Sequence, residues 1–569
     1  MQEGRLEKKR AIWLAAGLLL VLVYLGGRLG SYHLCDYSRS PNEATRDLLG
    51  IRGTIYDCNG SQIQMAVSLP AWQFYIDRHQ INRKHKPELI IDTVADMLDV
   101  PREEVASRVF GTSSWGEKPL GVSSDQFVHE TLVKAPKLIS GVRAHDIAVR
   151  TYPHGRRMAH VIGFVNKEGV GSSGVEQRFE NHLRGTPGIA KNKKDGRGRE
   201  VRTPESTTVQ PIPGSNVHLT LDHNIQYVVE QALAEVVDQF QAESAWSIVQ
   251  EVKTGKILAM ATFPDFDPGN YNDVAKEVWR NHAVSMVYEP GSIMKAVSVS
   301  AALNERLVTP NTLVDAENGV FMYAGKPLRD HITGRITVSR ALAASSNIVC
   351  AKLGLMLGSQ RLDAYLRGFG FGNTLGIDLP GEERGLIGNW KSWDKLKPTR
   401  VPIGQGVAVT GLQMVNAYST IANGGKLMKP YVVDRIISAE GQTVFQAQPE
   451  VLGSPIRPEV AQAVREMLIG VTEAGGTGKR ADVKGYSVAG KTGTAQHAIP
   501  KAKGGGYSNT DYFASFVGFV PAREPVFCVL VSVDRPRPQH TGGYVAAPVF
   551  AKIAAATALY LEVPPDIPE

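Results

Sequence analysis

Cysteine is scarce in this chain of 569 residues, and no cluster of metal-ligating residues is visible in it. The four cysteines are Cys35, Cys58, Cys350 and Cys528, and their spacing fits no zinc or redox motif. Three disulfide pairings are formally possible, but buried or incidental thiols explain so few cysteines better than a disulfide framework does. No His-Glu-x-x-His motif is present either, so the sequence predicts no metal and no other cofactor.

Signatures of phosphate and nucleic-acid binding are also missing. Gly475-Gly476-Thr477-Gly478-Lys479 resembles a phosphate-binding loop, but the spacing from the first glycine is wrong and Arg480 stands where Ser or Thr would bind magnesium. The net charge of +7 is modest for this length, and no basic stripe is interleaved with aromatic residues. The charge favours a surface compatible with acidic polymers or a membrane, not nucleic-acid binding.

Long hydrophobic runs are missing except at the N-terminus. Residues 11–27 carry no charge, which is close to the lower limit of length for a membrane-spanning helix. Four basic residues precede the run and only Arg28 follows closely, so the N-terminus is expected in the cytoplasm. A cleaved signal peptide is the alternative, but no Ala-x-Ala-like site follows. The sequence predicts a cytoplasmic tail over 1–10, an uncleaved single-pass anchor over 11–29, and the rest of the chain outside the cytoplasm.

The length of the chain requires more than one core, so two or three domains are expected. Residues 203–216, rich in Pro, Thr and Ser, mark a boundary. The segment 45–216 mixes short strands, helices and turns and is expected to form a non-catalytic domain. After the boundary, residues 224–240 have helical spacing, and strands and helices mix to about residue 560 without strict βαβ alternation. The fold class predicted for 217–560 is α+β.

Three short motifs have the residue types of a catalytic site: Ser292-Ile293-Met294-Lys295, Ser345-Ser346-Asn347 and Lys491-Thr492-Gly493-Thr494. Ser292 follows a Pro-Gly turn and opens a predicted helical run over 293–303. Its hydroxyl is therefore expected at a helix N-terminus, with Lys295 one turn along the same face.

Each pattern recurs elsewhere, so its context must be considered. Ser392-Trp393-Asp394-Lys395 lies in a polar stretch with no apolar helix after it, and Ser40-Pro41-Asn42 repeats the second pattern. Lys253-Thr254-Gly255 lies between alternating apolar runs at 246–252 and 257–263, which predicts a hairpin turn. Only the first set has all three motifs in compatible surroundings.

A serine hydroxyl is a poor nucleophile unless a base lies within hydrogen-bond reach. We expect Ser292 to be the nucleophile and Lys295 the base, its pKa lowered by desolvation and by the neighbouring cation Lys491. Ser345 would relay a proton to the leaving amine or from the attacking amine. Asn347 would hydrogen-bond Lys295 and the substrate amide.

The strand that carries Lys491 is expected to bind an anionic group of the substrate. Lys491 supplies a cation, Thr492 and Thr494 supply hydroxyls, and Gly493 lets the substrate backbone approach closely. The backbone N–H groups of Ser292 and Thr494 would form an oxyanion hole. Taken singly, each motif has a plain structural explanation as an N-cap, a helix junction or a surface turn. Together they favour a catalytic site.

The chain resembles the class B penicillin-binding proteins, the monofunctional peptidoglycan D,D-transpeptidases, whose signature is this trio of motifs. The resemblance covers about residues 50–555. Cys58 stands where the family usually has arginine, and Phe513–Phe519 resembles the septal, division-type (FtsI-like) branch. The other matching segments are Arg52–Gly60, Arg150–Pro153, Gly174–Glu176, Leu183–Gly185, Arg280–Asn281, Gly404–Gly406 and Gly543–Phe550.

This resemblance implies a penicillin-binding serine transpeptidase fold, a β-sheet flanked by helices, over 217–560. It also implies a pedestal (dimerisation-like) domain over 45–216 and an anchor in the inner membrane, with the catalytic domain in the periplasm. Ser292 would attack the penultimate D-Ala carbonyl of a peptidoglycan stem peptide on lipid-linked nascent glycan and pass the acyl group to an amine of a neighbouring strand. β-Lactams would acylate the same serine. A polytopic glycosyltransferase and other division proteins would be membrane partners.

Two other classes of function use the same fold. A β-lactamase or D,D-carboxypeptidase would use water as the acceptor, although the tether and pedestal argue against the former. A non-catalytic β-lactam sensor or division scaffold would keep the fold and the anchor. The intact motifs argue against a scaffold, and the lack of further membrane spans argues against a sensor.

Overall fold

The computed structural model describes residues 18–19, 21–24, 43–77, 81, 86–110, 118–134, 141–194, 200–204, 206–499, 502 and 505–567. The predicted tail (1–10), most of the predicted anchor (11–29), Cys35 and the Ser40-Pro41-Asn42 triplet lie outside these residues. Within the anchor, residues 18–19 and 21–24 are helical. The cysteines in the described residues, Cys58, Cys350 and Cys528, are free thiols.

The chain divides into two compact units, of which the smaller comprises residues 1–50 and 186–212. Its described part is a small antiparallel sheet in which β6 (Gly188–Lys194) is central. This strand pairs with β1 (Glu43–Leu48), β7 (Glu200–Val201) and β8 (Thr207–Val209).

The larger unit, residues 51–185 and 213–569, contains a seven-stranded sheet built from both sides of the predicted boundary at 203–216. β9 pairs in parallel with β2, with Ile55 opposite Val217, and antiparallel with β17, with Val433 opposite Leu219. These pairings connect the two predicted domains through backbone hydrogen bonds. The strands are β2 (Ile55–Tyr56), β3 (Gln64–Ile76), β4 (Lys118–Ser123), β5 (Val142–Thr151), β9 (Asn216–Leu219), β17 (Val433–Ile437) and β18 (Thr443–Gln446).

Three of the segments that suggested the family meet in one buried ion-pair network. The carboxylate of Glu176 is fully buried and accepts hydrogen bonds from Arg52 Nε (2.7 Å) and Arg150 Nε (2.6 Å). Arg52 also pairs with Glu180, and Arg150 Nη1 donates to the carbonyl of Gly53 (2.8 Å). Because a buried carboxylate is costly unless it is paired, these residues depend on one another.

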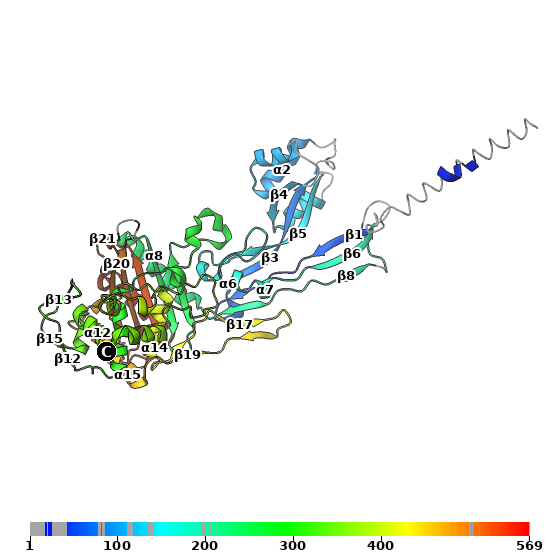
Figure 1. The fold of residues 1–569 in the computed structure, drawn as a ribbon. Helices are drawn as coiled ribbons and strands as arrows, with labels where there is room; N and C mark the ends of the chain where they lie inside the picture. The colour runs from blue at the N-terminus through cyan, green and yellow to red at the C-terminus, as the bar shows by residue number, and fades with distance from the viewer. Residues whose placement is uncertain are drawn as a thin grey trace, which may run out of the picture. The chain divides into compact units, whose positions relative to one another are not determined.

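The five-stranded antiparallel sheet has the order β11-β10-β22-β21-β20, and strands β20 and β21 can be followed in Figure 1. Its strands are apolar on both faces, since alternate residues enter two different cores. Ile248 packs with the helices that follow Ser292, whereas Val249 packs with the N- and C-terminal helices of this part of the chain. The strands are β10 (Ser244–Glu251), β11 (Ile257–Phe263), β20 (Ala489–Ala498), β21 (Tyr507–Val520) and β22 (Phe527–Asp534).

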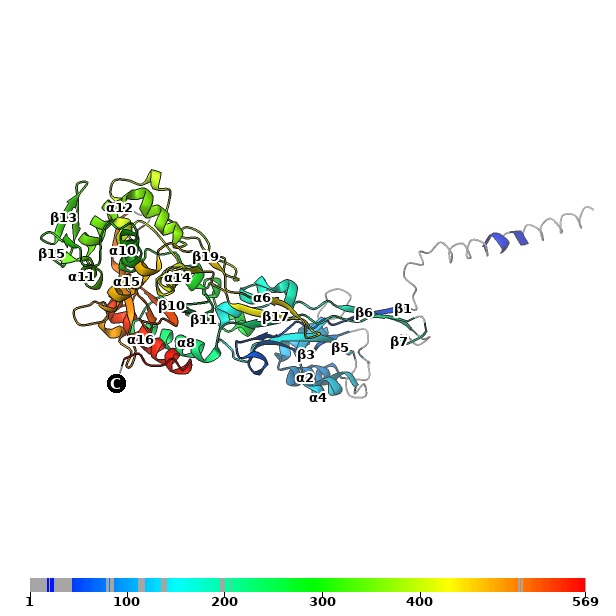
Figure 2. The ribbon, with the colours of Figure 1, turned by 90° about the horizontal axis from the view of Figure 1, so that it is seen from below.

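Helices cover both faces of this sheet, which gives three layers. Figure 2 shows α8 (His223–Phe240) and α16 (Gly542–Tyr560) on one side of it and a helical group on the other. That group contains α10 (Lys295–Asn304), α12 (Asn347–Gly368), α14 (Gly411–Ala422) and α15 (Pro458–Ile469). The predicted α+β class and the sheet flanked by helices are confirmed.

Several predicted elements are present with small shifts at their ends. The helix predicted over 224–240 is α8, and the strands predicted over 246–252 and 257–263 are β10 and β11. They form a hairpin whose turn contains Lys253-Thr254-Gly255, with Gly255 at a φ of +84°. That triplet is therefore a turn, as predicted.

Helix α16 is the one described helix that is long and apolar enough to cross a membrane, by length and composition alone. About 56% of it is buried inside the protein, however. Phe550 packs against Phe516 of β21, with ring centroids 4.7 Å apart. This packing is that of a core helix.

Candidate active site

Ser292 lies on a tight turn that its glycine neighbours make possible. Gly291 has a φ of +58°, and its N–H donates to the carbonyl of Gly404 (3.1 Å). A Cβ on Gly404, itself at a φ of +76°, would lie 2.1 Å from the carbonyl oxygen of Gly291. The backbone at Gly404 therefore packs against the Ser292 turn at a distance that only glycine permits.

The helix predicted over 293–303 begins with a 3-10 turn, Gly291–Met294, before α10 continues it. Side chains at positions i and i+3 eclipse in a 3-10 helix, so this turn stacks Lys295 on the same face as Ser292. A hydrogen bond from α14 also holds this turn, because the hydroxyl of buried Tyr418 donates to the carbonyl of Ile293 (2.8 Å). Ser292 itself is only partly buried.

Lys295 is fully buried and binds the second motif directly. Its Nζ donates to Ser345 Oγ (3.0 Å), to the carbonyl of Ser345 (2.6 Å) and to Asn347 Oδ1 (2.7 Å). Burial lowers the pKa of Lys295 to about 8, and the nearby carboxylate of Asp330 opposes the shift. A fraction of this amine is therefore neutral at physiological pH, as a general base requires.

The second motif is a strained junction between two helices. Ser345 has a φ of +63°, unusual for a residue with a side chain, and turns the chain from α11 (Val338–Ala343) into α12. Ser346 caps α12 by accepting from Val349 N, and its hydroxyl donates to Asp330 Oδ2 (2.5 Å). The buried carboxylate of Asp330 thereby fixes the junction that presents Ser345 to Lys295.

The third motif lies on the edge strand β20, opposite β21. Lys491 is fully buried, and its Nζ donates to the carbonyl and the hydroxyl of Thr492 (3.3 Å each). Thr494 is exposed and accepts a hydrogen bond from Gly542 N at the start of α16 (3.1 Å). A Cβ on Gly493 would lie 3.1 Å from Ile293 and 3.2 Å from the carbonyl of Pro290. Gly493 therefore permits contact with the Ser292 turn, and its expected contact with substrate stays a prediction.

The two buried lysines are coupled electrostatically, and the expected effect of Lys491 on Lys295 stays a prediction. Burial and the charge of Lys295 hold the pKa of Lys491 well below its usual range. Burial is the main cause of the lowered pKa of Lys295. Each buried cation disfavours the charge of the other, so an anionic group of a substrate would favour the protonated form of Lys491.

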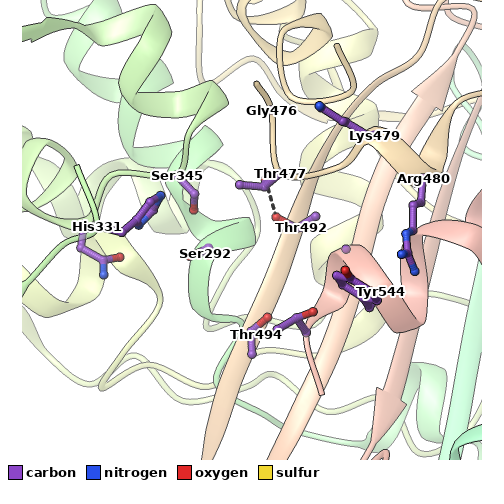
Figure 3. Close-up of a pocket in the computed structure, with 13 residues that line it drawn as sticks. Ser292, His331, Ser345, Gly476, Thr477, Lys479, Arg480, Thr492, Thr494 and Tyr544 are labelled. Atoms are coloured by element: carbon purple, nitrogen blue, oxygen red, sulfur yellow. Dashed lines mark hydrogen bonds between the residues drawn. The ribbon is translucent and has the colours of Figure 1, made fainter. Parts of the chain in front are cut away.

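A cleft of about 640 Å³ joins the three motifs (Figure 3). Its lining includes Ser292, Ser345, Asn347, Thr492 and Thr494, whereas Lys295 and Lys491 lie behind its wall. A second cavity of about 360 Å³ shares Ser292, Asn347 and Thr494 with the first. Ser292 therefore opens onto two adjoining spaces.

Several cleft residues were not predicted as site residues. His331 and Thr477 line the cleft, together with Lys479, Arg480 and Tyr544. Thr477 Oγ1 is 2.7 Å from Thr492 Oγ1. Thr477 and Lys479 belong to the glycine-rich stretch 475–479, which does not have the spacing of a phosphate loop but forms part of the cleft wall. The glycines of this stretch were the sequence signal that could have identified it as part of the site. His331 has no such signal, because it follows a small hairpin and belongs to none of the three motifs.

The repeated Ser-x-x-Lys motif lies away from the cleft. Ser392 ends a short 3-10 helix, Trp390–Ser392, and its hydroxyl donates to the carbonyl of Asn389 (2.7 Å). Ser392 and Lys395 are both exposed, and neither lines the cleft. Burial of the lysine thus distinguishes the two copies of the motif.

Two family sequence models match the chain. Residues 246–555 match the penicillin-binding protein transpeptidase domain, and residues 48–219 match the penicillin-binding protein dimerisation domain. The first match covers more than half of the chain and contains all three motifs.

Curated relatives match over most of the chain. Stage V sporulation protein D of Bacillus subtilis is 32% identical over 511 residues, covering 88% of this chain and 77% of the relative. Peptidoglycan D,D-transpeptidase FtsI of Escherichia coli is 30% identical over 563 residues, covering 96% and 91%. Among solved structures, penicillin-binding protein 3 of Mycobacterium tuberculosis complexed with aztreonam has a TM-score of 0.70 at 26% identity, covering 92% and 99%. The chain belongs to the class B penicillin-binding proteins.

Proposed function

We propose that this protein is a serine-type peptidoglycan D,D-transpeptidase and a target of β-lactams. One observation carries the proposal: fully buried Lys295 hydrogen-bonds Ser345 and Asn347 beside a cleft lined by Ser292. The names of FtsI of E. coli and of the aztreonam complex support the activity and the drug sensitivity respectively.

In this proposal, neutral Lys295 takes the proton of Ser292 as Oγ attacks the penultimate D-Ala carbonyl of a stem peptide. The backbone N–H groups of Ser292 and Thr494 stabilise the oxyanion. Ser345 Oγ, 3.0 Å from Lys295 Nζ, passes a proton to the departing D-Ala amine. The acyl-enzyme then reacts with an amine of a neighbouring strand, with the proton steps reversed.

The substrate's terminal carboxylate is assigned to the strand side of the cleft. Thr492 and Thr494 offer hydroxyls there, and Lys491 lies directly behind them. Asn347 Oδ1 accepts a hydrogen bond from Lys295, and Asn347 Nδ2 donates one to the carbonyl of Arg329 (3.0 Å). These two hydrogen bonds fix the orientation of the Asn347 side chain. Its contact with a substrate amide remains part of the proposal.

The proposal also includes the location and the partners of the protein. The positive N-terminus and the charge-free run at 11–27 support a single-pass inner-membrane anchor with the catalytic domain in the periplasm. Residues 45–216 would be the pedestal and 217–560 the transpeptidase domain. Similarity to FtsI supports a septal role on lipid-linked glycan with a polytopic glycosyltransferase and division proteins.

Depletion of the protein from cells tests the septal role. Depletion should block cell division, whereas loss of cell shape with continued division would contradict the septal role.

Mass spectrometry after incubation with labelled penicillin tests the chemistry. We expect the label on the peptide that contains Ser292 and none on the peptide that contains Ser392. Incubation with a D-Ala-D-Ala stem peptide and an amine should then give a new amide. Hydrolysis alone would favour a carboxypeptidase or β-lactamase, and a label on Ser392 would contradict the assignment.

A further inference from the structure

A thiol and two buried carboxylates meet outside the cleft. Asp57 follows β2 and is fully buried, and Asp222, the N-cap of α8, is 5% exposed. Cys58 lies beside them and is exposed. One ligand atom from each of these three residues lies within 4.8 Å of the other two. We name Asp57, Cys58 and Asp222 the thiol–carboxylate cluster; none of them lines either space beside Ser292.

The cluster lacks a matching positive charge. Among the residues that the structure describes, no lysine or arginine forms an ion pair with Asp57 or Asp222. His223 Nδ1 lies 2.8 Å from Asp57 Oδ2, and this contact is an ion pair only when the imidazole is protonated. Cys58 also stands where the family usually has arginine, so this chain has a thiol in place of a cation. Because buried carboxylates are costly unless they are paired or coordinate a metal, the cluster favours a cationic ligand.

The hydrogen bonds of the cluster direct one oxygen of each carboxylate at the same place. Asp222 Oδ1 caps α8 by accepting from two backbone N–H groups, whereas Oδ2 accepts from the Cys58 thiol (3.4 Å) and Tyr560 OH (2.8 Å). Asp57 Oδ1 accepts from Asn59 N (2.8 Å). Asn59 Nδ2 lies between the carboxylates and donates to Asp57 Oδ2 (2.8 Å) and Asp222 Oδ2 (3.1 Å). These two Oδ2 atoms therefore converge on a point that one neutral amide now occupies.

The distance between thiol and carboxylate matches that of a tetrahedral zinc site. Zn²⁺ binds thiolate sulfur at about 2.3 Å and carboxylate oxygen at about 2.0 Å, which places the two ligand atoms about 3.5 Å apart. The distance from Cys58 Sγ to Asp222 Oδ2 is 3.4 Å. A metal ion between them takes the place of the thiol proton, which leaves to solvent. Asn59 is exposed, so its amide can rotate and present Oδ1, an oxygen ligand, where it now donates.

We propose that Asp57, Cys58 and Asp222 bind Zn²⁺. A thiolate selects a metal of this class over Ca²⁺ and Mg²⁺, which prefer oxygen ligands alone. His223 donates to Asp57 and orients its carboxylate. The metal joins the segment after β2 to the start of α8, 164 residues further along the chain, so no motif spacing indicates it. The inference does not rest on the proposed function, because these residues lie outside the cleft.

Metal binding is tested on the full-length protein in detergent, without a histidine tag, after a chelator has removed any metal. Titration with Zn²⁺ against a coloured chelator should show one ion per chain. Co²⁺ in place of Zn²⁺ should give the near-ultraviolet absorption band of a cobalt–thiolate bond, and excess Ca²⁺ should displace neither metal. No binding, or cobalt bound without the thiolate band, would overturn the inference.

Variants assign the binding to the cluster. Cys58→Ser should abolish the cobalt–thiolate band and lower the affinity for Zn²⁺ by at least about 100-fold, whereas His223→Ala should keep the band and lower the affinity about 10–100-fold. Cys35→Ser is the matched control, since it removes a thiol outside the cluster and should change neither quantity. Circular dichroism checks that each variant is folded. Equal affinities in Cys58→Ser and the parent protein, or loss of the band in Cys35→Ser, would contradict the assignment.

A measurement on the parent protein alone covers the case in which a variant does not fold. Alkylation of Cys58 by iodoacetamide, followed by mass spectrometry of the peptide that contains it, should slow about tenfold or more when Zn²⁺ is present, because the thiolate is then bound. The peptide that contains Cys35 is the internal reference, and Zn²⁺ should not change its alkylation. An unchanged rate at Cys58, or equal slowing at both cysteines, would overturn the inference.

Discussion

The pH dependence of acylation follows from the burial of Lys295 and can be worked out in sign and size. The pKa of this amine is about 8, and its neutral form is the proposed base for Ser292. The neutral fraction is roughly 3% at pH 6.5 and roughly 75% at pH 8.5, so acylation should accelerate about 25-fold over this range. The rate should level off above pH 9.

The assay is the second-order rate of acylation by a β-lactam, measured by stopped flow, at several pH values. A β-lactam with no group that titrates between pH 6 and 9 is required, so that the profile reports the protein alone. A rate that does not change between pH 6.5 and 8.5, or that falls, would refute the assignment of Lys295 as the base.

Asp330→Asn provides the matched perturbation. The carboxylate of Asp330 raises the pKa of Lys295 against the effect of burial, so removing its charge should lower that pKa further. The midpoint of the pH profile should move to lower pH, and acylation at pH 6.5 should become faster relative to its plateau. The amide keeps one oxygen that can accept from Ser346, but its NH2 group would face the backbone N–H groups that now donate to Oδ1. Circular dichroism and a denaturation curve should therefore show that the variant is folded before its pH profile is compared. A midpoint that moves to higher pH would contradict the electrostatic account.

Three further predictions address the strand, the turn and the pedestal. Lys491→Ala should slow acylation by substrates with a free carboxylate much more than by carboxylate-masked analogues; equal losses in the measured rates would exclude an anchoring role. Gly404→Ala should lower penicillin acylation strongly while circular dichroism shows a folded protein, because the new Cβ would lie 2.1 Å from the Gly291 carbonyl next to Ser292; a normal rate would contradict this. Glu176→Ala should lower the free energy of unfolding by about 3–5 kcal/mol, since it leaves buried Arg150 without its carboxylate and Arg52 with Glu180 alone, and a denaturation curve would check this. The folded fraction of that variant should still bind penicillin.

Much of the catalytic core was predictable because its signals are local. Ser292 and Lys295 are three residues apart on one turn, and the Pro-Gly sequence before them marks the bend. Strands β10 and β11 are apolar runs on either side of a glycine turn, and α8 has an apolar face with helical spacing. In each case the sequence pattern spans a single helix, turn or hairpin. Within such an element, the repeat of the helix or strand determines which side chains share a face.

The remaining site residues are brought together by tertiary contacts that have no local pattern. Asp330 fixes the Ser345 junction across 16 residues through Ser346, and Thr477 reaches Thr492 from a loop. Arg480 was considered only as the residue that disqualifies a phosphate loop, because its partner Tyr544 is distant in sequence.

The glycines show why a motif can be recognised before its physical reason is known. Gly493 was expected to make room for substrate, yet a Cβ there would first meet Ile293 and the carbonyl of Pro290. On its other side, a Cβ on Gly542 would lie 2.3 Å from the carbonyl oxygen of Gly493, and Gly404 approaches Gly291 in the same way. These contacts set the spacing between the Ser292 turn, the edge strand β20 and the start of α16. A methyl group at Gly493 would press on the Ser292 turn, one at Gly404 would press on Gly291, and one at Gly542 would press the start of α16 against β20. Each would change a distance between the chain segments that form the proposed site.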